Sequence, residues 1–172
     1  MGTKKVKVAI CYDFDGTLSP GNMQEHSLLP KLNIKPQDFW KEVENMAKKE
    51  KMSKILTYMY LILNKSKGKE QINHKTFKQY GKGINLFNGV KDYFEKINVY
   101  AQSKDVELEH YIISSGMKEI IEGTDIKKYF KAIFASEFYY DVNKVAVWPK
   151  IVIDYTAKTQ YLFRINKGIL NV

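Results

Sequence analysis

The sequence has little cysteine and no long hydrophobic segment, and each shortage excludes a class of protein. Its single cysteine, Cys11, excludes an intrachain disulfide framework and a cysteine-rich zinc site. No apolar run approaches the length of about 20 residues that a membrane-spanning helix needs. The apolar stretch after the basic N-terminus, residues 8–11, is far too short for the core of a signal peptide. We therefore expect a soluble, cytoplasmic protein without a membrane partner.

What the chain does have is enough apolar material for one folded domain and a surplus of positive charge. Hydrophobic residues make up 44% of its 172 residues, which excludes wholesale disorder. Its 28 Lys and Arg against 19 Asp and Glu leave a net charge of +9. The lysines are spread along the chain, with one dense stretch at residues 48–54, and no nucleic-acid-binding motif accompanies them. The pattern favours a solvated surface over a nucleic-acid partner.

The first half of the chain changes from a strand pattern to a helical one. An alternating, β-branched stretch at residues 6–12 predicts a strand. Apolar residues then recur at helical spacing in residues 39–47 and 55–63, with Pro36 where a first helical turn accepts proline. A shorter helix is predicted near residues 76–80.

The second half alternates helix and strand patterns. They are a helix at 90–97, a strand at 109–113, a helix from 117 and a strand at 132–135. Residues 142–147 and 151–155 then predict a hairpin with its turn at 148–150, and a last helix is predicted with Thr156 as its cap and Gly168 at its end. Alternating helices and strands favour βαβ units and a parallel sheet covered on both faces.

The expected fold class is therefore α/β, with a Rossmann-like parallel sheet, helices on both faces and a small helical cap inserted after the first strand. We assign residues 1–19 and 85–172 to the core and residues 20–84 to the cap. Open sheets of this kind bind ligands at the carboxyl ends of their strands. That rule selects residues 13–17 and 114–116 as candidate binding segments.

The first segment places two carboxylates at the end of a strand. Asp13 and Asp15 are two residues apart, so an extended chain projects both to the same side. One carboxylate can act as nucleophile or metal ligand and the other as proton donor, and a carboxylate nucleophile can form an aspartyl-phosphate. Gly16 and Thr17 offer backbone N–H groups that suit a phosphate. The alternative is a plain turn, because Asp and Gly favour turns.

The second segment and the last helix add groups that bind anions. Ser114, Ser115 and Gly116 lie between a hydrophobic strand and a predicted helix, where a hydroxyl and free N–H groups make an anion site. The alternative is that one serine only caps the helix. Lys158, in the last helix, is placed to direct its ammonium at the same phosphate, although a helix lysine by itself is usually solvated.

The order of these segments resembles the haloacid dehalogenase-like (HAD) superfamily. The matching features are Asp-Phe-Asp-Gly-Thr-Leu after a strand, Ser-Ser-Gly after a second strand, and Thr-Ala-Lys at a helix start, with an insert between the first two. The chain resembles most the phosphoserine phosphatase-like branch, whose helical cap follows the first motif. The resemblance covers residues 6–168.

The resemblance implies a hydrolase that cleaves a small phosphorylated substrate with Mg²⁺. Asp13 would attack phosphorus and ligate Mg²⁺, and Asp15 would protonate the leaving oxygen and then activate water, its backbone carbonyl touching the metal. Ser114 would bind the phosphoryl oxygens, together with neighbouring residues 115–116, and Lys158 would screen the charge between Asp13 and the phosphate. Neutralising the repulsion between two anions is what makes such an attack possible.

The superfamily closes its metal site with a fourth, acidic motif, and nothing after Lys158 is acidic. We expect a fragment of a longer phosphatase with weakened Mg²⁺ affinity and turnover. Its open sheet edge should favour self-association. The alternative is a HAD-like protein with impaired catalysis that binds a phosphorylated or anionic ligand, nucleic acid included.

Overall fold

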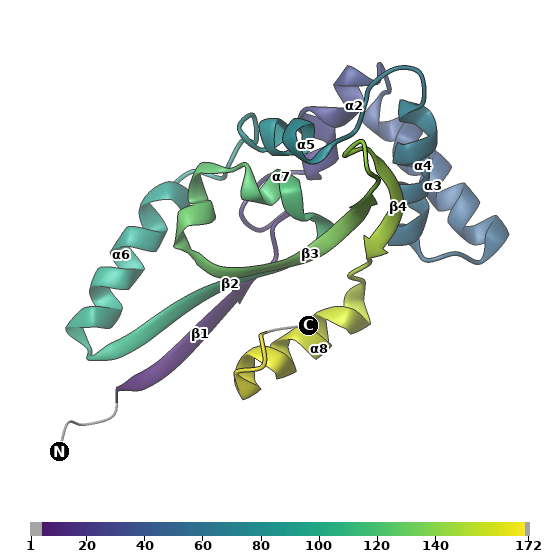
Figure 1. The fold of residues 1–172 in the computed structure, drawn as a ribbon. Coiled ribbons are helices and arrows are strands. Elements are labelled where there is room, and N and C mark those ends of the chain that lie inside the picture. Colours follow the sequence, from purple (N-terminus) through teal and green to yellow (C-terminus); the bar gives the residue numbers. More distant parts are fainter. Residues whose placement is uncertain (1–4, 171–172) are drawn as a thin grey trace.

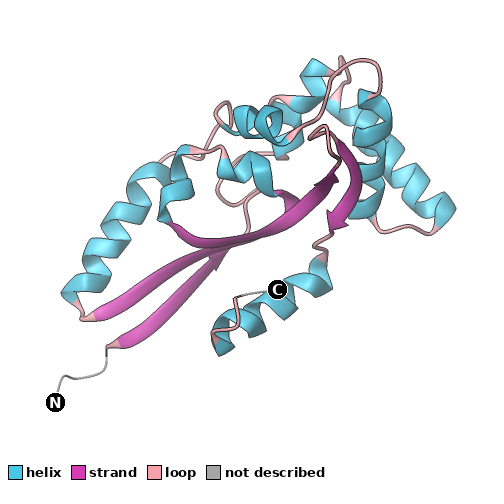
Figure 2. Ribbon diagram, in the orientation of Figure 1, coloured by secondary structure: helices cyan, strands magenta, loops and turns pink. Residues whose placement is uncertain are grey.

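The computed structural model describes residues 5–170, which form an α/β structure with one four-stranded sheet (Figures 1 and 2). The strands stand in the order β1-β2-β3-β4, with β1, β2 and β3 parallel and β4 antiparallel to β3. The elements are β1 (Val6–Tyr12), α1 (Met23–His26), α2 (Leu28–Lys31), α3 (Pro36–Glu50), α4 (Lys54–Ser66), α5 (His74–Gly81), α6 (Val90–Ser103), β2 (Val106–Met117), α7 (Lys118–Glu122), the 3-10 helix η1 (Asp125–Tyr129), β3 (Phe130–Tyr140), β4 (Ala146–Ile151) and α8 (Tyr155–Lys167). The expected α/β class and mostly parallel sheet are confirmed.

Helices lie on both sides of the sheet, with α6 and α7 on one face and α8 on the other (Figure 1). The alternating side chains of β2 explain this arrangement, because neighbouring residues of a strand point to opposite faces of the sheet. Ile112 belongs to the larger core with Phe94 of α6, whereas Ile113 packs in a smaller core with Tyr161 of α8. Both faces of the central strand are therefore buried.

The helices α1 to α5 lie together beyond one end of the sheet (Figure 1). Two glycines let this segment approach the core backbone closely: a Cβ at Gly81 would lie 2.0 Å from the Ile120 carbonyl oxygen, and one at Gly123 would lie 2.0 Å from the Lys78 carbonyl oxygen. Helix α5 therefore contacts α7 backbone to backbone, a contact that any larger side chain at either position would block.

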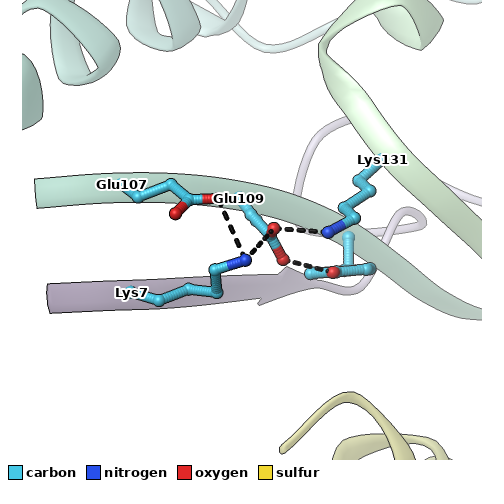
Figure 3. Close-up of polar contacts among 5 residues, drawn as sticks. Lys7, Glu107, Glu109 and Lys131 are labelled. Atoms are coloured by element: carbon cyan, nitrogen blue, oxygen red, sulfur yellow. Dashed lines mark hydrogen bonds and ion pairs between the residues drawn. The ribbon is translucent and has the colours of Figure 1, made fainter. Parts of the chain in front are cut away.

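A cluster of ion pairs ties the three parallel strands together (Figure 3). Lys7 of β1 contacts Glu107 and Glu109 of β2, at 3.0 and 3.2 Å, and Lys131 of β3 also pairs with Glu109. The Tyr111 hydroxyl donates to the other oxygen of Glu109 at 2.5 Å. Burial opposes ionisation of Glu109, but these hydrogen bonds outweigh it and lower its pKa to about 2.

The predicted hairpin of residues 142–147 and 151–155 does not form; β3 and β4 form a hairpin instead. Residues 148–150 lie inside β4, and β4 pairs with β3, so the predicted turn at these residues is wrong. The chain reverses at residues 141–145, where the Asp141 carboxylate accepts the N–H groups of Asn143 and Val145, each at 2.9 Å. Proline is tolerated in β4 because an edge strand does not need every N–H group for pairing.

The last helix, α8, is capped two residues earlier than predicted. Asp154, not Thr156, caps α8, because its carboxylate accepts the Ala157 N–H at 2.9 Å.

No helix within residues 5–170 is long and apolar enough to cross a membrane.

Candidate active site

The carboxyl ends of β1 and β2 lie side by side and bring the first two candidate segments together. Tyr12, the last residue of β1, is in register with Ile112 of β2. Asp13 therefore emerges from the sheet beside the end of β2, where Ser114 follows two residues after that pair. Residues about 100 positions apart in the sequence thus meet at one edge, as parallel pairing requires.

Asp13 is held by a lysine from the other end of the chain. The Lys158 Nζ donates to Asp13 Oδ2 at 2.5 Å across 145 positions of sequence. The other oxygen, Oδ1, accepts the backbone N–H of Phe14 at 2.8 Å. Both side chains stay partly exposed, so the pair faces an accessible space. Lys158 therefore supplies a positive charge directly at the carboxylate that is the candidate nucleophile.

Asp15 has a different environment from Asp13. Its Oδ1 accepts the Met23 backbone N–H at 2.9 Å, and its Oδ2 would lie 3.1 Å from a Cβ at Gly116. Burial raises the pKa of the Asp15 carboxyl to about 7; the Met23 hydrogen bond opposes that rise, and the negative charge of Asp13 adds to it. A carboxyl group whose pKa lies near neutral pH is suited to donate a proton.

Gly16 and Thr17 form the tight turn that follows the two aspartates. Gly16 has φ +73°, in the left-handed region that favours glycine. Its N–H donates to the Ser19 carbonyl at 2.8 Å, and the Thr17 N–H donates to the Phe14 carbonyl at 3.2 Å. In this conformation the backbone N–H groups of both residues bond within the turn, rather than facing the site as donors for a phosphate.

Ser114, Ser115 and Gly116 lie in the last part of β2 and not at the start of a helix, since α7 begins at Lys118. Ser114 is 1% exposed, and its hydroxyl oxygen accepts the Gly116 N–H at 3.0 Å. The Ser115 carbonyl accepts the Tyr58 hydroxyl of α4 at 2.7 Å. The segment is therefore bound to helix α4, which sequence reasoning did not connect with it.

A cavity of about 360 Å³ lies where these segments meet. It is lined by Asp13, Asp15, Asn22, Gln24, Trp40, Val43, Glu44, Lys54, Ile55, Tyr58, Ser114, Ser115, Gly116, Tyr155 and Lys158. A larger cavity of about 750 Å³ lies between α4 and β4, is mostly apolar and contains none of the candidate catalytic groups. The smaller cavity is the candidate active site because the titratable groups converge there.

Helices α1, α3 and α4 supply part of the cavity wall, through residues that no motif marked. Trp40 of α3 is held in place by Glu25, whose carboxylate accepts its indole N–H at 2.6 Å. The Asn22 side chain donates to the same carboxylate oxygen at 2.7 Å. Gln24 of α1 also lines the cavity. A single sequence offers no signal for these residues, because their position depends on how three helices pack.

The oxygen-rich site fits Mg²⁺ in the kind of ligand it offers. Mg²⁺ prefers oxygen ligands and keeps several waters. The carboxylate of Asp13 and the backbone carbonyl of Asp15 are donors of that kind, and no cysteine or histidine lines the cavity. Within residues 5–170, no group of three or more His, Cys, Asp or Glu is arranged to hold a metal. The described part of the chain therefore offers an incomplete set of ligands, with room for waters.

Sequence comparison finds a relative whose function is not described. No protein-family model matches the chain. An uncharacterized protein of Borreliella burgdorferi is 28% identical over 193 aligned positions, which cover 98% of this chain and 67% of that protein. The relative extends well beyond the matched part and carries no functional description.

Comparison of structures defines the fold. A HAD family hydrolase from Salmonella enterica serovar Typhi has a TM-score of 0.66 at 13% identity, over 95% of this chain and 52% of that one. A phosphoserine phosphatase solved as a phospho-aspartyl intermediate analogue has a TM-score of 0.65 at 16% identity, over 95% and 73%. A phosphoserine phosphohydrolase-like protein of Francisella tularensis has a TM-score of 0.61 at 18% identity, over 98% and 75%.

These matches show that the chain has the fold of HAD hydrolases. Among the similar structures, phosphoserine phosphatases are prominent, so the resemblance stated from the motifs is confirmed at the level of structure. The chain spans about half the length of the Salmonella hydrolase that it matches.

Proposed function

We propose that the chain is a Mg²⁺-dependent phosphomonoester hydrolase that acts through an aspartyl-phosphate on Asp13. The observation that carries this proposal is the convergence of Asp13, Asp15, Ser114 and Lys158 on one cavity, from three separate segments of the chain. A carboxylate nucleophile, a proton donor, a hydroxyl and a cation are the groups that this displacement needs. The structural similarity to a phosphoserine phosphatase in a phospho-aspartyl form adds support.

The first half of the reaction transfers the phosphoryl group to the protein. A carboxylate oxygen of Asp13 attacks phosphorus, and the bond from phosphorus to the leaving oxygen breaks. Asp15 donates its proton to that oxygen, so that the product leaves as a neutral alcohol. Its raised pKa supports this role because the carboxyl keeps its proton closer to neutral pH than an ordinary aspartic acid does.

The second half returns the protein to its starting state. Asp15, now a carboxylate, accepts a proton from water, and the water oxygen attacks phosphorus. The bond between phosphorus and Asp13 breaks, which releases inorganic phosphate. Lys158, 2.5 Å from Asp13, offsets negative charge throughout, and the Ser114 hydroxyl would donate to a phosphoryl oxygen. Mg²⁺, held by the Asp13 carboxylate and the Asp15 carbonyl, would reduce the repulsion between nucleophile and phosphate.

The test is hydrolysis of p-nitrophenyl phosphate, measured with Mg²⁺ and with a chelator. We expect Mg²⁺-dependent turnover that Asp13→Asn lowers by about a thousandfold or more, because the nucleophile is lost. Asp105→Asn, an exposed aspartate far from the cavity, is the matched control and should keep full activity. Undiminished turnover in Asp13→Asn would refute the mechanism. Binding of phosphate esters without any turnover would instead favour a binding protein.

A further inference from the structure

One buried polar atom in the cavity wall has no partner. Gln24 of α1 is 2% exposed, and within residues 5–170 its side-chain oxygen Oε1 accepts no hydrogen bond. Leaving a buried amide oxygen unpaired costs about 1–3 kcal/mol, and native proteins carry few such atoms. Because Gln24 lines the same cavity as Asp13 and Asp15, a molecule that enters the site can supply the missing donor.

The wall's donors that carry a single proton are already used. The Trp40 indole donates to Glu25 at 2.6 Å, and the Tyr58 hydroxyl donates to the Ser115 carbonyl at 2.7 Å. Each of these two bonds would have to break before its donor could reach Oε1 of Gln24. The unpaired oxygen therefore follows from the packing of α1, α3 and α4.

The rest of the wall limits what the ligand can be. The cavity volume of about 360 Å³ is at the small end of the range for ligand sites. Val43, Ile55 and the Trp40 ring add apolar surface to this wall, and Glu44 and Lys54 are paired with each other at 3.5 Å. A small leaving group with a hydrogen-bond donor fits this wall.

We propose that Gln24 is a specificity-determining residue that accepts a hydrogen bond from a hydroxyl or amino group on the leaving alcohol of a small phosphate monoester. This inference rests on the proposed phosphatase function and adds the class of substrate to it. A site built to hydrogen-bond a substrate group discriminates against the analogue that lacks the group, because its buried polar atom then stays unpaired.

The test compares three esters with the same number of heavy atoms: n-propyl phosphate, 2-hydroxyethyl phosphate and 2-aminoethyl phosphate. We expect the native chain to favour at least one donor-bearing ester over the propyl ester by about tenfold in kcat/KM. Dissociation constants measured in Asp13→Asn should show the same order without turnover. The ester that is favoured identifies the donor as hydroxyl or amino.

Gln24→Met removes the amide at nearly constant volume and should bring the preference close to one, because the acceptor for the donor-bearing esters is lost. Its Tm and circular dichroism spectrum show whether the variant stays folded. Gln24→Glu keeps an acceptor in place and should retain a preference for the amino ester. Gln102→Met makes the same change on the exposed surface of α6 and should leave all three rates unchanged.

Two results would overturn the inference alone: equal use of all three esters by the native chain, or a preference that persists in Gln24→Met. Failure to hydrolyse or bind any of the three, or p-nitrophenyl phosphate, would overturn the proposed function and the inference with it. The two failures are therefore distinguishable.

Discussion

Gly116 occupies a position where the structure leaves no room for a side chain. A Cβ there would lie 2.2 Å from Met23 Cε, 2.8 Å from Met23 Sδ and 3.1 Å from Asp15 Oδ2. Met23 is fully buried and cannot move into solvent, so Gly116→Ala overpacks the site. We expect a loss of about 1–3 kcal/mol in the free energy of unfolding. For a chain of 172 residues, that corresponds to a Tm lower by roughly 2–12 °C.

Met23→Ala supplies the space that the new methyl group needs and makes the reasoning testable. Alone, it should cost about 2–5 kcal/mol through the cavity it leaves. The double variant should lose less stability than the sum of the two single losses, by about 1 kcal/mol or more, because each change relieves the other. Urea unfolding of all three variants measures this difference. Gly83→Ala, whose Cβ would meet only Ser27 Oγ at 3.3 Å and the Tyr80 carbonyl at 3.7 Å, is the control. Losses that add to within about 0.5 kcal/mol would refute the steric argument.

Two further predictions concern the sheet. Glu109→Gln should lower stability by about 1 kcal/mol at neutral pH; because the folded-state pKa of Glu109 is about 2, below its ordinary value, the difference from the native chain should shrink as pH falls from 5 towards 2. Urea unfolding across that range measures it, and a gap that widens on acidification would contradict the ion-pair account. Within residues 5–170, β1 is an edge strand of the sheet, and its Val8 side chain is 38% exposed. We expect this edge to promote self-association. In sedimentation velocity, Val8→Lys should weaken the self-association, whereas Val99→Lys on α6 should not. A native chain that is monomeric at every concentration would rule out self-association through this edge.

Much of the fold could be predicted because its elements carry strong local patterns. The helix with Pro36 in its first turn and the apolar positions of α4 follow from 3.6-residue periodicity, and they match the structure. The hairpin turn predicted at residues 148–150 is wrong. The Asp141 side chain forms the turn instead, and Pro149 lies in the edge strand β4. Periodicity alone cannot distinguish an edge strand from a turn at a proline.

The sequence by itself determined the chemical groups at the strand ends: the spacing of Asp13 and Asp15, the serines after β2 and a lysine in the last helix. These are local features, and their order along the chain was enough to predict the fold class. Only the tertiary structure decided that Lys158 reaches Asp13 across 145 residues and that Asp15 is buried. It also decided that Gln24 keeps an unpaired oxygen in the cavity. Burial and the pairing of donors depend on packing between distant segments, and no short stretch of sequence specifies that packing.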